Sequence, residues 1–383
     1  MDRNYLKRVA ILGSTGSIGV NTLNVIREHN SNFKVVALSA RKNTKLLLKQ
    51  TKEFKPEIVA IADEESADKF KKKVMPAVKV VSGMEGMKHI ASLEITDIVV
   101  SAIVGAAGLL PTIEAIKSGK TIALANKEVL VTAGEIVMHL AQKCKAKIIP
   151  VDSEHSALFQ CLQGEDINSV KRLILTASGG PFRNFHAKRL HKVSIREALN
   201  HPRWIMGQKV TIDSATMMNK GFEVIEAHWL FGVALQNIKV VIHPQSIIHS
   251  MVEFKDGAIL AQMSEPDMRL PIQYALTYPV RMERKSKKFN FSKNGTLTFE
   301  PPDFKKFPCL KLAYRAARAG GTMPTVLNAA NEVAVARFLK NEIQFTDIPE
   351  IIKKAMNNHK VLENPDIDDI LNVDKAIRKE NFA

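Results

Sequence analysis

Short apolar runs recur along the first 150 residues and alternate with longer segments in which apolar residues follow helical spacing. The runs contain few polar residues, which is typical of strands buried on both faces of a parallel sheet. The predicted strands are 8–12, 34–39, 58–62, 78–81, 98–102, 121–125 and 147–151. Helical patterns at 18–28, 44–53 and 128–143 lie between them. This alternation predicts an α/β fold with a doubly wound parallel sheet.

The pattern changes after residue 151, where helices and strands are mixed. The segments expected here are a helix at 153–163, a strand at 172–176, a helix at 213–229 and a hairpin at 252–260 that turns at Asp256-Gly257. Ser194 and Glu197 have the spacing of a capping box. These elements predict an α+β domain over residues 151–283.

The last hundred residues are predicted to be mainly helical. Residues 284–307 are rich in Lys, Pro and Phe and are interpreted as a connecting segment. Helical spacing then returns at 310–319, 325–339, 348–356 and 367–379. Residues 308–383 are therefore expected to form a small C-terminal helical domain.

The composition is that of a globular protein, with 45% hydrophobic and 25% charged residues among 383. A chain of this length exceeds one ordinary hydrophobic core, which supports a division into domains. The first residues are polar and the longest apolar run, 98–110, is too short to span a membrane, so we expect neither a targeting segment nor membrane association. Three widely spaced cysteines argue against disulfides or a zinc cluster and favour a cytoplasmic location.

The formal net charge of +16 raises the question of a nucleic-acid partner. The lysines are spread along the whole chain, and the densest runs, 69–73 and 284–288, have little aromatic or glycine interleaving. We interpret these runs as solvated helix faces and loops, and predict no nucleic-acid partner. The remaining positive field favours anionic phosphate ligands.

A glycine-rich turn, Gly13-Ser14-Thr15-Gly16-Ser17-Ile18-Gly19, follows the first predicted strand and opens a helix. In this context glycines let the backbone approach a pyrophosphate, while the helix N-terminus supplies positive potential. Its spacing differs from the commoner G-x-G-x-x-G, and a tight turn without a ligand is the alternative. Because the turn lies within a seven-strand alternation, we predict a Rossmann-like dinucleotide-binding domain over residues 1–150.

The end of the second predicted strand distinguishes between the two nicotinamide dinucleotides. An NAD site usually places an Asp or Glu there, on the ribose 2′-hydroxyl. This chain has Ser39-Ala40-Arg41-Lys42-Asn43 instead. Two cations without a carboxylate favour the 2′-phosphate of NADPH, and two surface cations in a loop are the alternative.

Two polar clusters follow later strands, at the edge of the sheet where ligands bind. Asn126-Lys127-Glu128 follows the sixth strand and Asp152-Ser153-Glu154-His155 follows the seventh. In extended geometry Asp152 and Glu154 point the same way, which suits a hard divalent cation such as Mg²⁺ or Mn²⁺. The alternative is that each cluster only caps the helix that follows it.

The predicted helix 213–229 begins with a second polar group. Lys220 and Glu223 share one of its faces, and Ser214 and Asn219 lie near the same end. Neighbouring Met and Phe residues indicate partial burial, and buried polar groups need partners. A polyhydroxylated phosphate ligand would supply them, whereas an ordinary surface face is the alternative.

A lid is predicted over residues 200–209. The segment His201-Pro202-Arg203-Trp204-Ile205-Met206-Gly207 places a tryptophan between residues that are typical of loops. Such a ring can shield a site from water when the loop closes. The alternative is a tryptophan that anchors the loop to the core.

In this order and spacing, these motifs resemble those of the 1-deoxy-D-xylulose 5-phosphate reductoisomerase family. Ala-Ser-Gly-Gly-Pro-Phe at 177–182 and the segment 243–250 also match, and the resemblance runs from about residue 8 to beyond Asn331. It implies a homodimeric oxidoreductase of the non-mevalonate isoprenoid pathway. Such an enzyme isomerises 1-deoxy-D-xylulose 5-phosphate and reduces the product with NADPH to 2-C-methyl-D-erythritol 4-phosphate, using Mg²⁺, Mn²⁺ or Co²⁺.

The resemblance also implies roles for individual residues. The metal ligands would be Asp152, Glu154 and Glu223. The catalytic residues would be Lys127, Glu154, His155 and His249. The substrate would contact Ser153, Glu154, Ser178, His201, Trp204, Met206, Ser214, Asn219, Lys220 and Glu223. NADPH would contact Thr15, Gly16, Ser17, Ile18, Arg41, Lys42, Asn43, Asn126, Glu128 and Gly207. Family members usually have glycine at the position of Arg41, so we expect a differently shaped 2′-phosphate loop here.

Two other functions remain open at this stage. A semialdehyde or sugar-phosphate dehydrogenase also begins with a glycine turn of this kind. An acylating member needs a cysteine nucleophile with a histidine partner, and none of the three cysteines lies in such a motif. A non-catalytic NADPH-sensing or nucleic-acid-binding protein would fit the turn and the charge, but it has no need of the three carboxylates.

Overall fold

The computed structural model describes residues 6–204, 206–286, 288–292 and 295–380. Ile205 of the predicted lid, residues 287 and 293–294 of the predicted connecting segment, and both ends of the chain lie outside the described residues. The chain forms two compact units. As far as their segments are described, unit 1 comprises Met1–Val129, Val137–Ser156 and Asp267–Ser286, and unit 2 comprises Leu130–Ile136, Ala157–Pro266 and Lys287–Ala383.

Unit 1 is built on a seven-stranded parallel sheet with the order β4-β3-β2-β1-β5-β6-β7. The strands are β1 (Lys7–Leu12), β2 (Phe33–Ala40), β3 (Ile58–Ile61), β4 (Lys79–Ser82), β5 (Ile98–Ser101), β6 (Thr121–Leu124) and β7 (Lys147–Pro150). The order runs outward from β1 in both directions, so the predicted doubly wound, Rossmann-like fold is confirmed. Each strand lies within one or two residues of its predicted position.

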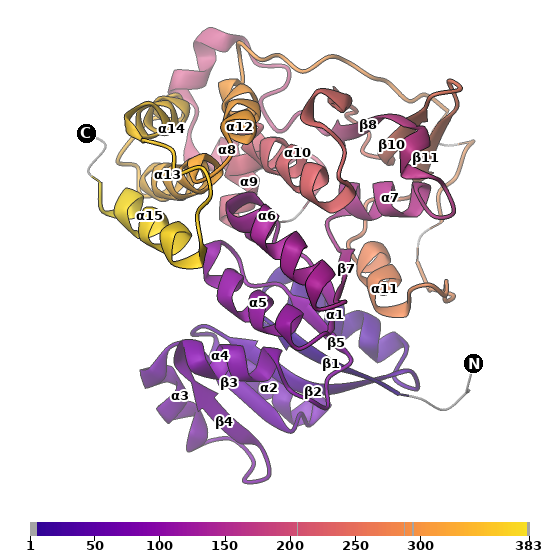
Figure 1. Cartoon of the computed structure of the whole chain (residues 1–383), viewed down its shortest axis with the longest axis vertical. Coiled ribbons are helices and arrows are strands. Elements are labelled where there is room, and N and C mark those ends of the chain that lie inside the picture. The colour runs from indigo at the N-terminus through magenta and orange to yellow at the C-terminus, as the bar shows by residue number, and fades with distance from the viewer. Residues whose placement is uncertain (1–5, 205, 287, 293–294, 381–383) are drawn as a thin grey trace. The chain divides into compact units, whose positions relative to one another are not determined.

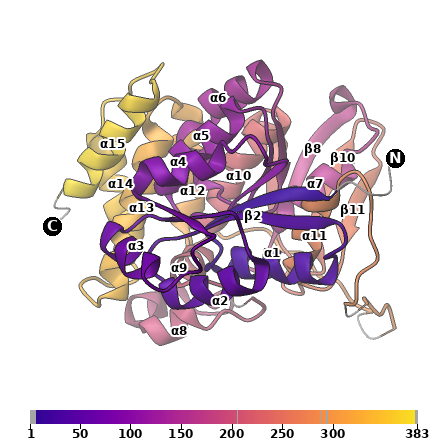
Figure 2. The ribbon, with the colours of Figure 1, turned by 90° about the horizontal axis from the view of Figure 1, so that it is seen from below.

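Helices cover both faces of this sheet, which explains why its central strands lack polar alternation. Helices α1 (Ser17–Glu28) and α2 (Thr44–Phe54) lie on one side of β2, and α4 (Gly83–Ala91) and α5 (Leu109–Lys117) lie on the other (Figure 2). The remaining helices of the N-terminal segment are α3 (Glu64–Lys71) and α6 (Glu128–Lys143), whose backbone is non-helical at Ala133. The strand ends that carry polar residues therefore meet at one edge of a buried sheet.

Residues Asp267–Ser286 belong to unit 1, although the sequence pattern places 267–283 in the second domain and 284–286 in the connecting segment. They contain α11 (Arg269–Thr277), a helix that the sequence pattern did not predict because Pro271 interrupts it. Proline is tolerated there, since the first turn of a helix does not use its N–H groups. Lys7 Nζ donates to the Leu276 carbonyl (3.0 Å), and Gln273 Oε1 lies 3.1 Å from His29 Nε2. Bonds to residues more than 200 positions away hold this segment to the N-terminal sheet.

Unit 2 contains a mixed four-stranded sheet with the order β11-β10-β8-β9. Its strands are β8 (Val170–Ala177), β9 (Ile238–Ile242), β10 (Ile248–Phe254) and β11 (Ile259–Met263). Strands β10 and β11 form the predicted hairpin, and Gly257 in its turn has φ +92°. Strand β9, which was not predicted, pairs in parallel with β8.

The helix predicted at 213–229 is wrong in one respect: it is two helices, α9 (Gln208–Ala215) and α10 (Met218–Phe231). Met217 between them has φ +64°, a left-handed conformation that ends one helix before the next begins. Apolar spacing continues across the break, so the sequence pattern does not reveal it. The break places Ser214 on α9 and Asn219 on α10.

The C-terminal helices of unit 2 are α12 (Pro308–Ala319), α13 (Met323–Leu339), α14 (Asp347–Asn358) and α15 (Ile367–Lys379). They gather around α13, whose residues are buried on almost every side (Figure 1). The predicted helical C-terminal region is thus confirmed. Unit 2 also contains most of α7 (Ser153–Cys161) and all of α8 (Ile195–Leu199), which begins with the predicted capping box.

Four short 3₁₀ turns complete the described secondary structure: η1 (Ala106–Gly108), η2 (Ile167–Ser169), η3 (Ala187–Lys192) and η4 (Leu235–Asn237). Within the described residues, every helix is too short or too polar to span a lipid bilayer.

Candidate functional site

The glycine turn after β1 is packed too closely to accept side chains. Gly13 has φ +87°, and a Cβ there would lie 2.7 Å from the Ala102 carbonyl oxygen. A Cβ on Gly19 would lie 2.4 Å from the Gly13 carbonyl oxygen. The Gly13 N–H donates to Ser39 Oγ (2.9 Å), and the Ser14 N–H donates to the Ser39 carbonyl (2.8 Å). The turn is therefore fixed to the end of β2, where the ribose of a dinucleotide would bind.

The N-terminus of α1 is not capped by a side-chain hydrogen bond. Gly16 is its N-cap and has no side chain to satisfy the first N–H groups of the helix. The first turn also contains no acidic residue, so the positive end of the helix dipole is not neutralised locally. The predicted cofactor contacts Thr15, Gly16, Ser17 and Ile18 lie at this end, which suits an anionic diphosphate.

The three predicted 2′-phosphate residues are all exposed, but they differ in what holds them. Asn43 is the N-cap of α2 and accepts from the Leu46 N–H (3.2 Å). Lys42 Nζ forms an ion pair with Asp63 Oδ1 (3.3 Å), beside which the Asp63 N–H donates to the Arg41 carbonyl (3.3 Å). Asn43 is occupied in capping the helix, so Arg41 and Lys42 would supply most of the positive charge that a 2′-phosphate needs.

Asn126 is buried at the end of β6 and holds the loop after β5. Its Nδ2 donates to the carbonyls of Ile103 and Gly105, the latter at 2.9 Å. Gly108 leaves room for this amide, because a Cβ there would lie 2.2 Å from Asn126 Nδ2. Among the described residues Asn126 Oδ1 has no hydrogen-bond partner. A buried acceptor of this kind fits a donor on a bound cofactor.

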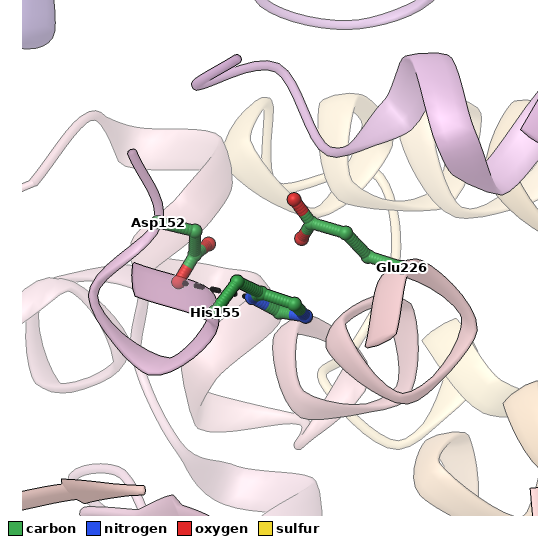
Figure 3. A group of neighbouring side chains, drawn as sticks. All are labelled: Asp152, His155 and Glu226. Atoms are coloured by element: carbon green, nitrogen blue, oxygen red, sulfur yellow. Dashed lines mark ion pairs between the residues drawn. The ribbon is translucent and has the colours of Figure 1, made fainter. Parts of the chain in front are cut away.

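Lys127 and Asp152 bring the two polar clusters of unit 1 together, since each follows one of the neighbouring strands β6 and β7. The Lys127 ammonium forms an ion pair with Asp152 Oδ2, and both side chains are about nine-tenths buried. His155 Nδ1 lies 3.7 Å from Asp152 Oδ1, and Figure 3 shows the two side chains facing each other. Burial alone would raise the pKa of the Asp152 carboxyl, but Lys127 and then His155 hold it well below its usual range.

Glu154 adds a second carboxylate beside Asp152. The two side chains offer oxygens that lie within 4.8 Å of each other, and the Ser153 hydroxyl donates to Glu154 Oε2. Two neighbouring carboxylates are suitable ligands for a hard divalent cation. Glu128, in the first turn of α6, is also buried.

In unit 2, helix α10 presents a third predicted metal ligand, Glu223. Asn219 Nδ2 donates to its Oε1 (2.5 Å), and Lys220 Nζ pairs with its Oε2. Glu223 and Lys220 are both almost completely buried, so the ammonium compensates a carboxylate charge that is shielded from water. Glu226, also labelled in Figure 3, lies one turn further along α10 and is fully buried.

Gly180 contacts both Ser178 and Ser214. Gly180, in the loop after β8, has φ +69°, and a Cβ there would lie 2.7 Å from the Ser214 carbonyl oxygen. Ser178 Oγ accepts from the Gly180 N–H (3.2 Å) and lies 3.1 Å from His201 Nε2. Two donors to this oxygen leave the Ser178 O–H itself able to donate to a phosphate.

His201 connects this loop to the predicted lid. Its Nδ1 accepts from the N–H groups of Arg203 (3.2 Å) and Trp204 (2.9 Å), so the proton of the neutral ring lies on Nε2, toward Ser178. Burial lowers the pKa of His201 to about 4. The imidazole is therefore neutral near pH 7, with its tautomer set by the lid backbone.

Trp204 and His249 lie together in unit 2, with ring centres 6.3 Å apart. His249 is buried, and its Nε2 lies 2.9 Å from Ser264 Oγ. Met206 is half-buried, and Gly207 is the exposed N-cap of α9. The predicted lid residues thus precede α9 directly, and Trp204 lies near a predicted catalytic histidine.

Two of the three cysteines, Cys161 and Cys309, argue against the acylating dehydrogenase. Burial raises the pKa of the Cys161 thiol to about 11, with a small opposing effect from the Gln262 N–H. Burial and the Asp213 charge raise the pKa of the Cys309 thiol to about 12. A nucleophilic cysteine needs a lowered pKa, so neither thiol is suited to covalent catalysis.

The structure also contains a buried polar group to which the sequence analysis gave no role. The Asp213 carboxylate pairs with Lys209 Nζ (2.9 Å) and accepts from Asn331 Nδ2 (2.8 Å). Asp213 was visible in the motif around Ser214, and its four-residue spacing from Lys209 indicates a helical ion pair. Asn331 is 118 positions away, and nothing in the sequence pairs it with Asp213.

Family models match three segments that together cover most of the chain. Residues 9–134 match the model described as 1-deoxy-D-xylulose 5-phosphate reductoisomerase. Residues 148–231 match the C-terminal domain model of the same name, and residues 263–380 match the DXP reductoisomerase C-terminal domain.

Relatives and solved structures agree with these models. The chain is 60% identical over 375 residues to a 1-deoxy-D-xylulose 5-phosphate reductoisomerase of Acetivibrio thermocellus, and 58% identical over 375 residues to that of Caldanaerobacter subterraneus subsp. tengcongensis. Each alignment covers 98% of this chain and 98% of the relative. It is similar in structure to the Zymomonas mobilis enzyme in complex with NADPH (41% identity, TM-score 0.92) and to a DOX-P reductoisomerase in complex with NADPH, fosmidomycin and magnesium (44%, TM-score 0.93). Both comparisons cover 98% of this chain and 97% of the other.

Proposed function

Because the chain belongs to the 1-deoxy-D-xylulose 5-phosphate reductoisomerase family, we propose that it converts 1-deoxy-D-xylulose 5-phosphate to 2-C-methyl-D-erythritol 4-phosphate in the non-mevalonate isoprenoid pathway. It is an oxidoreductase that uses NADPH and a divalent metal ion. We propose Mg²⁺ or Mn²⁺ as this ion. The structural observation that carries the proposal is the buried pair of Lys127 and Asp152 at the ends of two neighbouring strands. It keeps a carboxylate ionised beside an ammonium group, which suits a site where negative charge develops.

The metal ligands in this proposal are Asp152 and Glu154 together with Glu223. When bound, the metal ion acts as a Lewis acid toward the carbonyl and adjacent hydroxyl oxygens of the substrate. Lys127 supplies positive charge to the oxyanion that develops as the carbon skeleton rearranges, and Ser153 hydrogen-bonds the same end of the substrate. His155 orients Asp152, whose Oδ1 lies 3.7 Å from His155 Nδ1.

The phosphate end of the substrate belongs to unit 2 in this proposal. Ser178 and Ser214 donate from their hydroxyls, Asn219 from its amide and Lys220 from its ammonium group. His201 fixes the Ser178 hydroxyl through the contact at 3.1 Å. Trp204 and Met206 exclude water from the reacting carbon, and His249 lies beside Trp204.

NADPH supplies the hydride, and the protein orients its nicotinamide ring. The uncapped N-terminus of α1 supports a diphosphate at Thr15, Gly16, Ser17 and Ile18. Arg41, Lys42 and Asn43 receive the 2′-phosphate. Asn126, Glu128 and Gly207 complete the proposed cofactor contacts, and the buried acceptor of Asn126 supports this assignment.

Turnover tests the function directly. NADPH oxidation would be followed with 1-deoxy-D-xylulose 5-phosphate, in buffer with Mn²⁺ and in buffer with EDTA. We expect turnover that EDTA abolishes and added Mn²⁺ restores. Folded protein that never oxidises NADPH with this substrate and metal would refute the proposal.

Glu223→Gln tests the metal assignment. The variant removes a charged oxygen ligand, so we expect the Mn²⁺ concentration for half-maximal activity to rise at least tenfold while the Kd for NADPH stays within twofold. Glu65→Gln, which removes a carboxylate from an exposed pair with Lys69, is the control and should change neither value. Equal loss of NADPH and metal binding in Glu223→Gln would contradict the role.

We also propose that the enzyme is a cytoplasmic homodimer. Three free cysteines fit a reducing compartment. Strand β11 forms one edge of its sheet, and Ile259 and Leu260 on it are 52% and 42% exposed. An exposed apolar edge strand favours pairing with a second copy of the same strand.

A further inference from the structure

A buried polar group joins α9 to two other helices of unit 2. The Asp213 carboxylate is 1% exposed and pairs with Lys209, one turn earlier on α9. The carboxylate also accepts a hydrogen bond from the side-chain amide of Asn331 on α13. The Lys209 ammonium lies 4.9 Å from the centre of the Phe222 ring on α10, so the same cation also contacts the helix that bears Glu223.

Stability alone does not account for this group. A buried ion pair often contributes no more to stability than apolar residues of similar size, because both ions lose their hydration. Asn331 Oδ1 is buried and has no hydrogen-bond partner among the described residues, which is unfavourable because the oxygen has lost its contact with water. Rotating the Asn331 amide by 180° would bring this oxygen against the negatively charged Asp213 carboxylate. Electrostatic repulsion therefore fixes the orientation of the amide.

The group lies at the point where α9 gives way to α10. Asp213 directly precedes Ser214, whose carbonyl oxygen packs against Gly180. The left-handed residue Met217 then turns the chain into α10, which carries Asn219 and Lys220. Movement of α9 relative to α10 would therefore separate Ser214 from the other proposed phosphate contacts.

We propose that Asp213, held by Lys209 and Asn331, is a positioning residue for the phosphate end of the substrate. It acts through Ser214 and α10 and does not touch the substrate itself. The inference rests on the proposed function, because it assigns the phosphate to Ser178, Ser214, Asn219 and Lys220. Lys209, Asp213 and Asn331 are not among the proposed NADPH contacts, so loss of the group should affect the sugar phosphate more than NADPH.

Asp213→Asn tests the proposal with little change in volume. The new side chain still offers an oxygen to Asn331 but loses the ion pair with Lys209. We expect the KM for 1-deoxy-D-xylulose 5-phosphate to rise on the order of tenfold, because small displacements of positioning groups are costly. The KM for NADPH should stay within twofold, and the inhibition constant of inorganic phosphate, measured against the sugar phosphate, should rise in parallel.

Two variants of Lys209 distinguish a positioning role from a general loss of structure. They also test the proposal if Asp213→Asn does not fold. Lys209→Met should reproduce the selective rise in KM, whereas Lys209→Arg keeps the charge and should restore most of the wild-type value. Asp374→Asn is the control, since it breaks a helical pair with Arg378 (2.6 Å) on α15 that holds none of the proposed contacts. It should leave both KM values unchanged.

A folded Asp213→Asn with the wild-type KM for the sugar phosphate would overturn the inference. So would equal rises in both KM values, or a lower kcat with both KM values unchanged, since these indicate general loss of structure. Lys209→Arg behaving like Lys209→Met would also refute the charge-based role. A wild-type protein without turnover refutes the proposed function itself, whereas an active wild type with unaffected variants refutes only the positioning role.

Discussion

His201 illustrates how one side chain can set the state of a loop. Two lid N–H groups donate to Nδ1, and Nε2 lies against Ser178, so the neutral ring matches its surroundings. A proton on Nδ1 would face two donors and displace the lid backbone. The lowered pKa follows from burial and agrees with this geometry.

The pH dependence of stability should report this histidine. Its pKa is about 4 in the folded protein and 6.5 without the protein environment, so the unfolded chain binds the proton more readily. Its contribution to stability is then full above about pH 6.5 and is lost as the pH falls toward 4. Urea unfolding of the wild type and His201→Gln at pH 7 and pH 5 should show a larger acid loss in the wild type. His186→Gln, at an exposed histidine, is the control, and equal losses in wild type and His201→Gln would contradict the expectation.

Arg41 should contribute directly to the choice of coenzyme. Its guanidinium is exposed, whereas the Lys42 ammonium is already paired with Asp63. Arg41→Ala should raise the KM for NADPH about fivefold, since an exposed ion pair contributes up to about 1 kcal/mol, and it should leave the KM for NADH unchanged. Lys45→Ala, at an exposed lysine in the first turn of α2, is the control. An equal effect on both coenzymes would argue against a role at the 2′-phosphate.

At the scale of elements, close backbone approaches decide where the candidate site forms. Gly13 and Gly19 let the first turn fold against its own strand and the end of β5, and Gly180 lets the loop after β8 contact α9. Met217 separates α9 from α10 and so gives Ser214 and Asn219 different directions. These contacts determine which polar side chains can act on one ligand.

Gly180→Ala tests whether the contact between Gly180 and α9 matters for substrate binding and stability. Its Cβ would meet the Ser214 carbonyl oxygen, and the positive φ adds strain of about 1 kcal/mol or more. Gly164→Ala is a matched control, because Gly164 also has positive φ (+86°) but nothing lies within 4 Å of its Cβ position. We expect a several-fold higher KM for the sugar phosphate only in Gly180→Ala, with a larger fall in Tm than in Gly164→Ala. Identical behaviour of the two variants would mean that the contact is unimportant.

In the molecule as a whole, each compact unit is built from segments that are far apart in the sequence. Unit 1 combines the N-terminal sheet with Asp267–Ser286, and unit 2 combines its sheet with the C-terminal helices. Strand β11, the proposed dimer edge, belongs to unit 2 alone.

Leu260→Lys tests the proposed dimer. A charge on the exposed edge of β11 opposes strand pairing, so the variant should be monomeric in light scattering at micromolar concentration while the wild type is dimeric. Leu362→Lys is the control, since Leu362 is 45% exposed and lies outside the sheet. A dimer that survives Leu260→Lys would exclude this edge as the interface.

The parallel sheet, the glycine turn, the hairpin and the C-terminal helices are all predictable from local sequence, because each follows from periodicity or from glycine in a turn. Prediction from sequence failed where distant contacts override local pattern. Helix α11 looks irregular because of Pro271, and the break at Met217 leaves the apolar spacing intact.

The same division holds for the candidate site. Motifs nominate Lys127, Asp152 and Glu223 as polar residues beside apolar runs, but only the fold pairs Lys127 with Asp152 and fixes the tautomer of His201. The link from Asp213 to Asn331 spans 118 positions. Such partners are decided by tertiary structure, because burial in a common core creates the need for a hydrogen bond that local sequence does not contain.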